Sequence, residues 1–522
     1  MILTMLQPVY AESEATPLTI AAEYDDVGDF QGGFAAVEIG GDWGAIDKTG
    51  KLIVEPRFDW IEDFIDGYAL AGKYTKSIAP DGKSASYVNL RGLIEKKSGE
   101  VILEPIYNEV QWRGDGVLAV AKDEKYGLFD LAGNSLGEAR FQSIGEFKEG
   151  LAQVSVPHGS DDYRFGFIDL TGKLVIPTVY EGVFAKFESG LAIVGKSGKW
   201  GVIDKKGKIV IPFQYDKMSS SFVSGYAAVA KKGKWGVVDT KGKLVIPLKY
   251  DEVEVGPQAI IEYGIMRKPI VKGSLQKRQI VDRNGNYHDA DWGAIDLRTR
   301  KAIVPPQYQN VEVQADGLII VKKADKYGIV DRTGKPVVPA KYVRISDYHD
   351  PARKRIYVVR TKDQLGIYNP ATKQGVIRLY GYESAEFYDY KAELESMYPD
   401  VVRVHTTSNK WGLLDLTGKE IVKPAYDDIA DFSEGLAAVK LNGKYGFIDA
   451  KGKLVIKPQY ESVGTFREGL VSVKKSGKYG FVDKRGAEIV PPQFDRVHEF
   501  SDGLAAVNEK GKWGFISNPL TK

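Results

Sequence analysis

Residues 432–460 read FSEGLAAVKLNGKYGFIDAKGKLVIKPQY. This stretch contains three apolar runs of strand length, at 435–439, 445–449 and 453–456, and Pro458 follows the third. Short runs of apolar, β-branched and aromatic residues between glycine-containing turns are typical of β-strands. Apolar side chains occur at both odd and even positions, so both faces of each strand are expected to be covered, as in stacked sheets. The stretch therefore predicts three strands joined by tight turns.

The same pattern returns along the whole chain as an aromatic or degenerate residue followed by Gly, most often with two apolar residues and Asp behind it. Where nothing intervenes, the copies are 34 or 35 residues apart. A fixed period of this size predicts a tandem array in which one supersecondary unit is copied and stacked. The thirteen copies begin at Trp43, Arg91, Tyr126, Phe165, Trp200, Trp235, Trp292, Tyr327, Leu365, Trp411, Tyr445, Tyr479 and Trp513.

Blocks such as 225–229 (GYAAV), 234–239 (KWGVVD) and 243–247 (KLVIP) resemble the bacterial WG repeat, also called the KWG repeat. The resemblance extends over about residues 28 to 518. It implies an all-β array of mostly unknown function, without an assigned catalytic residue. Several copies depart from the pattern, since Arg91 and Leu365 replace the aromatic residue and the last copy ends at Ser517.

We expect the repeats to form an open, curved, solenoid-like array of β-hairpins. The alternative is one or two β-propellers, whose blades need four strands and usually 40 residues or more. A unit of 34 residues is short for a blade, although a weak fourth strand is possible through residues 426–429 and Phe432.

The order of segments gives the expected domain organisation. Residues 1–11 are interpreted as the remnant of a signal peptide and residues 12–27 as a linker. Repeats fill 28–251 and 291–518, with a degenerate insertion at 252–290 and a second insertion at 379–399. The export-like start predicts an extracellular or cell-envelope protein, with a cytoplasmic location as the alternative.

The repeated aromatic and acidic residues are interpreted as scaffold. Asp204 and Gly207 represent an Asp-x-x-Gly turn, in which the carboxylate accepts backbone N–H groups and Gly adopts the left-handed conformation. The Gly after the aromatic residue is expected to lie beneath an aromatic ring of an adjacent copy. Six motif tryptophans are expected to be buried between copies: Trp43, Trp200, Trp235, Trp292, Trp411 and Trp513.

Composition and motif spacing narrow the possible functions. The 72 Lys and Arg residues nearly balance the 70 Asp and Glu residues, which predicts no nucleic-acid partner. No stretch approaches the ~20 apolar residues of a membrane span, so no membrane insertion is expected. The chain has no Cys, and its five His residues lack metal-ligand spacing. Residues 190–197 (GLAIVGKS) match a phosphate-binding loop, but the surrounding repeat predicts a strand and turn there.

From these patterns we predict no catalytic residue, cofactor or metal. The expected function is a non-enzymatic binding or scaffold protein, a monomer that engages a protein or polysaccharide. The alternatives are a binder of carbohydrate or cell-wall glycan, and a propeller-type hydrolase or lyase. The enzyme would require two carboxylates, or a His and a carboxylate, to converge from different repeats. The predicted partner site is the aromatic and acidic insertion, through Tyr380, Tyr382, Phe387, Tyr388 and Tyr390.

Overall fold

The computed structural model describes residues 16–62, 67–78, 85–95, 97–160, 162–184, 186–255, 270–281, 287–297, 300–314, 316–349, 355–362, 365–372, 375–379, 382–387, 401–406, 408–415 and 417–521. These residues form an all-β protein with two short 3-10 turns, η1 (Pro370–Thr372) and η2 (Pro519–Thr521). The all-β prediction is therefore confirmed. The strands described here make thirteen antiparallel sheets, twelve of four strands and one of three.

The chain divides into two compact units. Unit 1 comprises Met1–Pro105 and Gly381–Lys522, and unit 2 comprises Ile106–Tyr380. The predicted interruption at 252–290 therefore falls within unit 2. The strands with which unit 1 is built are β1 (Ile20–Tyr24), β2 (Asp26–Val27), β3 (Phe34–Ile39), β4 (Asp42–Asp47), β5 (Leu52–Phe58), β6 (Trp60–Ile61), β7 (Tyr68–Ile78), β8 (Ala85–Glu95), β9 (Val101–Tyr107), β37 (Tyr382–Phe387), β38 (Val401–Thr406), β39 (Trp411–Asp415), β40 (Glu420–Tyr426), β41 (Asp428–Ser433), β42 (Leu436–Leu441), β43 (Lys444–Asp449), β44 (Leu454–Tyr460), β45 (Ser462–Val463), β46 (Leu470–Lys475), β47 (Lys478–Asp483), β48 (Glu488–Phe494), β49 (Arg496–Val497), β50 (Leu504–Glu509) and β51 (Lys512–Ser517).

Unit 2 contains the three-stranded sheet, formed by β10 to β12, and six sheets of four strands. Its strands are β10 (Glu109–Trp112), β11 (Val117–Lys122), β12 (Lys125–Asp130), β13 (Ser143–Ile144), β14 (Leu151–His158), β15 (Asp162–Asp169), β16 (Leu174–Tyr180), β17 (Gly182–Val183), β18 (Leu191–Lys196), β19 (Lys199–Asp204), β20 (Ile209–Tyr215), β21 (Lys217–Met218), β22 (Tyr226–Lys231), β23 (Lys234–Asp239), β24 (Leu244–Tyr250), β25 (Glu252–Val255), β26 (Ile270–Val281), β27 (Tyr287–Asp296), β28 (Ala302–Tyr308), β29 (Asn310–Val313), β30 (Ile319–Lys323), β31 (Lys326–Val330), β32 (Pro336–Tyr342), β33 (Arg344–His349), β34 (Arg355–Arg360), β35 (Leu365–Tyr368) and β36 (Ile377–Leu379).

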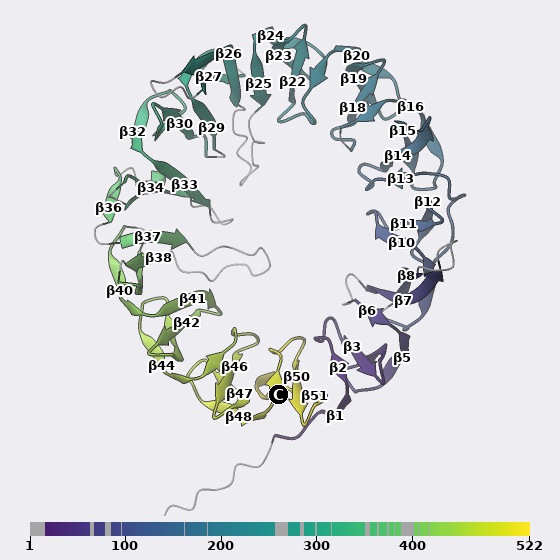
Figure 1. Ribbon diagram of the computed structural model, residues 1–522, viewed down its shortest axis with the longest axis vertical. Helices are drawn as coiled ribbons and strands as arrows, with labels where there is room; N and C mark the ends of the chain where they lie inside the picture. Colours follow the sequence, from purple (N-terminus) through teal and green to yellow (C-terminus); the bar gives the residue numbers. More distant parts are fainter. Residues whose placement is uncertain are drawn as a thin grey trace, which may run out of the picture. The chain divides into compact units, whose positions relative to one another are not determined.

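One repeat forms one four-stranded antiparallel meander, as the sheet from β41 to β44 illustrates (Figure 1). The three strands read from residues 435–456 are β42, β43 and β44. The fourth strand considered for a propeller blade is also present, because β41 pairs with β42 at Asp428 and Lys440. The last strand, β44, is an edge strand and contains Pro458, which removes a backbone donor and so discourages edge pairing. The repeating unit is thus the blade of the propeller alternative.

Successive sheets within a unit bury their apolar faces against each other. In unit 1, Phe447 and Ile456 of one sheet pack with Phe466 and Val471 of the next repeat in a single buried cluster. Side chains of both parities are buried in the middle strand β43, which agrees with the prediction that both sheet faces are covered.

The Gly after the motif aromatic residue is required by a bulge between the third and fourth strands of its sheet, as β39 and β40 show. Trp411 pairs with Tyr426 and Leu413 pairs with Val422, so β40 carries two extra residues opposite Gly412. A Cβ atom on Gly412 would lie 2.6 Å from the Val422 carbonyl oxygen, closer than contact allows. The expectation that an aromatic ring of an adjacent copy covers this Gly is therefore wrong, because backbone of the same repeat lies there.

The Asp-x-x-Gly turns have the predicted hydrogen bonds. The Asp204 carboxylate accepts bonds from the backbone N–H groups of Lys206 and Lys208, each at 2.9 Å, and Gly207 has a φ of 78°. In an equivalent turn, a hydrogen bond from the Thr49 hydroxyl, aided by backbone N–H groups, holds the pKa of Asp47 below its ordinary value. These carboxylates are occupied by their own turns.

The motif tryptophans are less buried than expected. Of the six, only Trp513 is buried, with 8% of its surface exposed, whereas Trp43, Trp200, Trp235, Trp292 and Trp411 are half-buried. Trp200, for example, packs against its core cluster but is not enclosed by it.

Strands from the two ends of the described chain share one sheet, in which β1 pairs with β51 (Figure 1). The sequence copy that stops at Ser517 lacks its outer strand, and Ile20–Tyr24 supplies it by pairing Ile20 with Phe515. A Cβ atom on Gly514 would lie 2.6 Å from the Ile20 carbonyl oxygen, as at the other motif glycines. The structure thus differs from the linker expected at 12–27, because β1 and β2 lie within that range.

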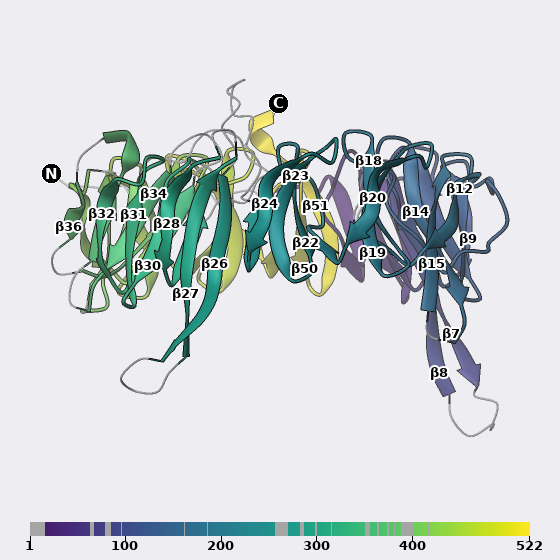
Figure 2. The same cartoon turned by 90° about the horizontal axis from the view of Figure 1, so that it is seen from above.

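Two hairpins are longer than the rest, and the first, β7–β8, extends beyond the other strands of its sheet (Figure 2). Tyr74 and Tyr87 on this hairpin are 52% and 73% exposed. The second, β26–β27, begins in the predicted insertion 252–290 and extends into the repeat that follows it. Residues 256–269 and 282–286 of that insertion, and residues 1–11, lie outside the described residues.

Candidate ligand-binding site

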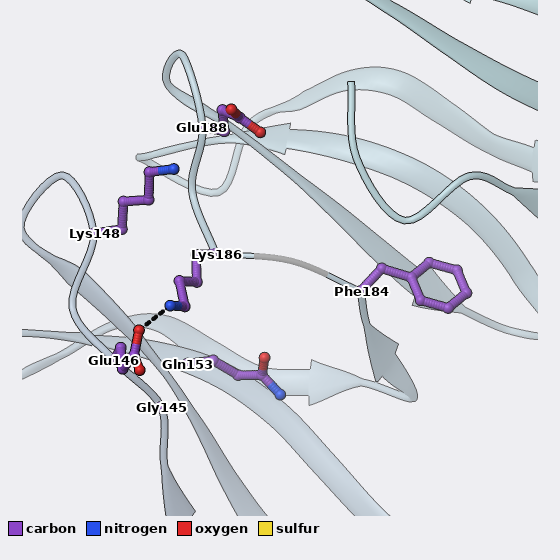
Figure 3. A pocket seen from close by; sticks show the side chains of 7 residues that line it. All are labelled: Gly145, Glu146, Lys148, Gln153, Phe184, Lys186 and Glu188. Atoms are coloured by element: carbon purple, nitrogen blue, oxygen red, sulfur yellow. Dashed lines mark hydrogen bonds and ion pairs between the residues drawn. The ribbon is translucent and has the colours of Figure 1, made fainter. Parts of the chain in front are cut away.

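A pocket of about 400 Å³ lies between two consecutive repeats of unit 2 (Figure 3). Its volume is within the range of roughly 300–1,000 Å³ that small-molecule sites commonly have. The lining combines two carboxylates, two ammonium groups, one amide and one aromatic ring. It consists of Gly145, Glu146, Lys148, Gln153, Phe184, Lys186 and Glu188.

Buried neighbours hold the two loops that form the pocket. The first loop follows β13, and two residues beside its pocket residues, Ile144 at the end of β13 and Phe147 between Glu146 and Lys148, are 1% and 7% exposed. The second loop follows β17 and is anchored by Phe187, which is fully buried and packs edge-on against Phe167 at 4.8 Å between ring centroids. Because these buried residues are fixed in the core, the polar side chains next to them start from defined positions.

An ion pair links the two loops. Lys186 of the second repeat donates to the Glu146 carboxylate of the first, as Figure 3 shows. This hydrogen bond holds the pKa of Glu146 below its ordinary value. Both side chains are about half exposed, so the pair contributes little to stability and leaves polar atoms at the pocket surface.

Phe184 lies flat on Trp200, with 3.8 Å between ring centroids and 18° between planes. The ring of Phe184 is nevertheless 46% exposed. Two glycines make room for this stack: Gly195 is the cross-strand partner of Trp200, and a Cβ atom on Gly182 would lie 2.9 Å from the Trp200 ring.

The Phe184–Trp200 stack differs from the arrangement in the repeats of Tyr445 and Tyr479, whereas His498 packs on Trp513 in the corresponding way. At the position of Gly195, unit 1 has Lys440 and Lys474, whose ammonium groups lie over Tyr445 and Tyr479 at 5.2 and 5.1 Å from the ring centroids. With Gly195 in place of lysine, Phe184 covers the motif ring instead. Gly195 also belongs to residues 190–197, which form β18 and a turn as predicted, and not a phosphate-binding loop.

The equivalent place in unit 1 is filled by a side chain. Both oxygens of Glu499 accept hydrogen bonds from Ser472, from its hydroxyl at 2.5 Å and from its N–H at 3.1 Å. The carboxylate also occupies the space that a Cβ atom on Gly464 would need. Burial raises the pKa of Glu499 above its ordinary value. The counterpart of Gly464 in unit 2 is Gly145, where the space stays open.

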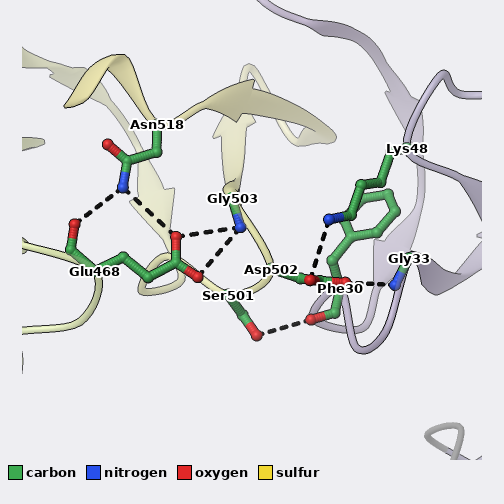
Figure 4. A network of polar contacts seen from close by, with 8 residues as sticks. All are labelled: Phe30, Gly33, Lys48, Glu468, Ser501, Asp502, Gly503 and Asn518. Atoms are coloured by element: carbon green, nitrogen blue, oxygen red, sulfur yellow. Dashed lines mark hydrogen bonds and ion pairs between the residues drawn. The ribbon is translucent and has the colours of Figure 1, made fainter. Parts of the chain in front are cut away.

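Polar contacts join the last and first repeats of unit 1 (Figure 4). The Asp502 carboxylate accepts a hydrogen bond from the Gly33 N–H and pairs with Lys48 at 3.1 Å, while the Ser501 hydroxyl donates to the Phe30 carbonyl at 2.7 Å. Consecutive repeats use the same kind of contact.

The two equivalent contacts are made by acidic residues at the same position in earlier repeats. Glu434 accepts from the Gly469 N–H at 3.1 Å, and Glu468 accepts from the Gly503 N–H at 3.1 Å. The join between the two ends of the described chain therefore repeats the regular contact between neighbours.

A His and a carboxylate from different repeats also meet at this join. His498 Nδ1 lies 2.7 Å from Asp29 Oδ1, and the imidazole packs on Trp513 at 4.9 Å between ring centroids. The hydrogen bond to Asp29 raises the pKa of His498 above its ordinary value. This is the type of convergence that the enzyme alternative requires.

The predicted partner site is only partly within the described residues. Tyr382 and Phe387 are the ends of β37, which pairs with β38, so this part of the insertion is a strand of a regular four-stranded sheet. Tyr380, Tyr388 and Tyr390 lie outside the described residues. The pocket residues Phe184 and Gln153 were not predicted. A sequence signal exists for Phe184, because Gly195 stands opposite the motif aromatic residue where Lys440 and Lys474 stand in other repeats.

Among the described residues, no group of three His, Asp or Glu side chains is arranged to hold a metal ion. In the same part of the chain, no helix has the length and hydropathy that a membrane span requires.

A family model described as WG containing repeat matches the chain in tandem. The matched segments are residues 18–42, 43–73, 92–126, 126–156, 165–200, 200–235, 235–255, 292–327, 327–352, 411–445, 445–479 and 479–513. The first segment begins just before β1, in agreement with the role of that strand in a repeat. No curated protein matches the sequence.

Several solved structures are similar at low identity. A eukaryotic initiation factor is 11% identical over 63% of this chain and 89% of its own, with a TM-score of 0.31. BamB from Moraxella catarrhalis is 11% identical over 66% of this chain and 91% of its own, with a TM-score of 0.23. PorZ, a surface component of the type-IX secretion system of Porphyromonas gingivalis, is 8% identical over 96% and 86%, with a TM-score of 0.20.

Proposed function

The chain belongs to the WG-containing repeat family, and from that premise we propose that it is a non-enzymatic binding or scaffold protein. Its partner is a protein or a polysaccharide, which it binds at the bacterial envelope or outside the cell. We further propose that the protein is a monomer that is not inserted in a membrane. It does not bind nucleic acid, in line with the near balance of 72 basic and 70 acidic residues.

The observation that carries this proposal is the open pocket at Gly145. The repeated carboxylates serve their own turns or the contacts between neighbouring repeats, as Asp204 and Glu434 do. At the pocket, in contrast, the pattern is interrupted: Phe184 is exposed on Trp200, and polar side chains surround unfilled space. A site that departs from a regular scaffold is where a ligand-binding role is expected.

A pocket-filling substitution tests the proposal. Gly145 has room for a side chain, because the nearest atom to an added Cβ is the Gln153 carbonyl oxygen at 3.5 Å, an ordinary contact. Gly145→Trp should fill the pocket and Gly145→Ala should leave it open. The wild type and both variants are immobilised and exposed to separated protein and polysaccharide fractions of bacterial envelopes. We expect a component retained by the wild type and Gly145→Ala, and lost with Gly145→Trp. Equal retention by all three proteins would contradict the pocket as the binding site.

A hydrolase or lyase is the second candidate function, favoured by the Asp29–His498 pair. The wild type, His498→Gln and Asp29→Asn are assayed on chromogenic ester and glycoside substrates and on uronate polymers. Turnover by the wild type that both folded variants lose would support the enzyme. A wild type without turnover on any of these substrates would count against it.

A further inference from the structure

We infer that the pocket at Gly145 binds an uncharged polysaccharide, with one sugar ring stacked on Phe184 and neighbouring rings beside the polar side chains, from which Phe184 points away in Figure 3. This inference rests on the proposed binding function and specifies its ligand. Three properties of the lining carry it: an exposed aromatic face that is held in place, a balance of charges, and a mixture of hydrogen-bond donors and acceptors.

The aromatic surface is rigid before any ligand binds. Trp200 supports one face of Phe184 at 3.8 Å between centroids, and the absence of side chains at Gly182 and Gly195 allows this stack. The face of an aromatic ring carries partial negative charge, which attracts the polarised C–H groups on the apolar face of a sugar ring. Because the ring is fixed by packing, binding costs little ordering of this side chain.

The formal charges of the lining cancel. Glu146 and Glu188 contribute two negative charges, and Lys148 and Lys186 contribute two positive charges. The pairing of Lys186 with Glu146 further reduces the attraction for an ion of either sign. A polyanion such as a nucleic acid would need an excess of basic side chains, which this lining does not offer. The ligand that suits it is therefore neutral.

The polar groups suit hydroxyls, which both donate and accept hydrogen bonds. The Gln153 amide can do both, the two carboxylates accept, and Lys148 donates. A peptide segment is a less suitable occupant, because peptides are usually held by apolar pockets for anchor residues or by a free strand edge. Here Phe184 is the one apolar side chain in the lining. The volume of about 400 Å³ is ample for a single sugar ring with its substituents.

The test measures binding of neutral oligosaccharides to the full chain by calorimetry. The probes are maltohexaose, cellohexaose, mannohexaose and chitohexaose, with oligogalacturonate as the charged comparison. We expect at least one neutral probe to bind and oligogalacturonate to bind more weakly. Phe184→Ala should weaken binding by about tenfold or more, as loss of a stacked ring does, whereas Phe184→Tyr should retain it. Gln153→Ala should also weaken binding.

A matched control is Tyr163→Ala, which removes another exposed ring of unit 2 outside the pocket, 43% exposed. It should leave affinity unchanged. Failure of all four neutral probes to bind, or equal affinity of the wild type and Phe184→Ala, overturns the inference. The proposed function is tested separately by the capture experiment. If a protein component is captured through the open Gly145 pocket, the binding function stands and the saccharide ligand is refuted. If Gly145→Trp captures the same component as the wild type, the pocket is refuted as the binding site.

Discussion

The ammonium group of Lys48 lies 3.1 Å from the carboxylate of Asp502, and this pair joins the first and last repeats of the described chain. The same carboxylate accepts a hydrogen bond from Gly33 (Figure 4). Glu434 makes the corresponding contacts with the following repeat, including an ion pair with Lys484 at 3.0 Å. In unit 1, the contacts between the first and last repeats are therefore of the same kind as the contacts between consecutive repeats.

Asp502→Asn should loosen this join. The variant loses the ion pair with Lys48 and weakens the bond to Gly33, and we expect a loss of about 1 kcal/mol because both side chains are partly exposed. Amide hydrogen exchange should accelerate in Ile20–Tyr24, which pairs with β51. Glu434→Gln, the matched change between consecutive repeats, should leave exchange in that strand unchanged. Unaltered exchange of Ile20–Tyr24 in Asp502→Asn would contradict the role of the join.

Gly412→Ala should destabilise unit 1 by roughly 3 kcal/mol, toward the upper end of the cost of overpacking. The added methyl would meet the Val422 carbonyl at 2.6 Å, and backbone on both sides of the bulge cannot withdraw easily. Denaturant unfolding measures the loss. Gly145→Ala, whose methyl has space, is the control and should change stability by only a few tenths of a kcal/mol. Equal stability of the two variants would refute the steric explanation of the motif glycine.

Asp204→Ala and Gly207→Ala should lower stability without changing ligand binding by folded protein. The first removes two backbone hydrogen bonds and should cost about 1 kcal/mol. The second places a Cβ atom at a φ of 78° and should cost about 1–2 kcal/mol. Calorimetric unfolding and oligosaccharide titration check the two effects. Loss of binding by well-folded Asp204→Ala would instead indicate a functional site in this turn.

Trp513→Ala should destabilise the protein more than Trp235→Ala. Trp513 is 8% exposed within a core cluster, so its truncation should cost about 3–5 kcal/mol. Trp235 is half-buried at the border of its cluster and should cost roughly half as much. In a repeat array the loss is local, so hydrogen exchange of the affected sheets accompanies the unfolding measurement. A larger effect of Trp235→Ala would contradict this ranking by burial.

Raising the pH from about 6 to about 9 should lower the melting temperature of the wild type more than that of His498→Gln. The hydrogen bond to Asp29 raises the pKa of His498, helped by the charges of Asp26 and Glu499 and opposed by burial. A raised pKa in the folded state means that the stabilisation is complete below the ordinary His pKa. It is lost as the pH rises through the folded-state pKa. Parallel pH profiles of the two proteins would show that this pair has no effect on stability.

Local sequence was sufficient to predict the strands and turns. Residues 435–456 specify β42 to β44 because apolar runs alternate with glycine turns, and the Asp204 turn needs only its own backbone. The first strand was harder to predict: β41 contains Asp428 and Asp431, and it is a strand because it pairs with β42.

A tandem all-β array follows from local properties that recur along the chain: the period, the turn chemistry and the apolar pattern. Which distant residues complete a repeat or form a pocket depends instead on tertiary packing. Ile20–Tyr24 becomes the outer strand of the last sheet by pairing across almost the whole length of the chain. Phe184 and Gln153 line one pocket because the loop after β17 lies beside β14 of the preceding repeat. Contacts of this kind arise from the packing of one sheet on the next, and no short window of sequence contains both partners.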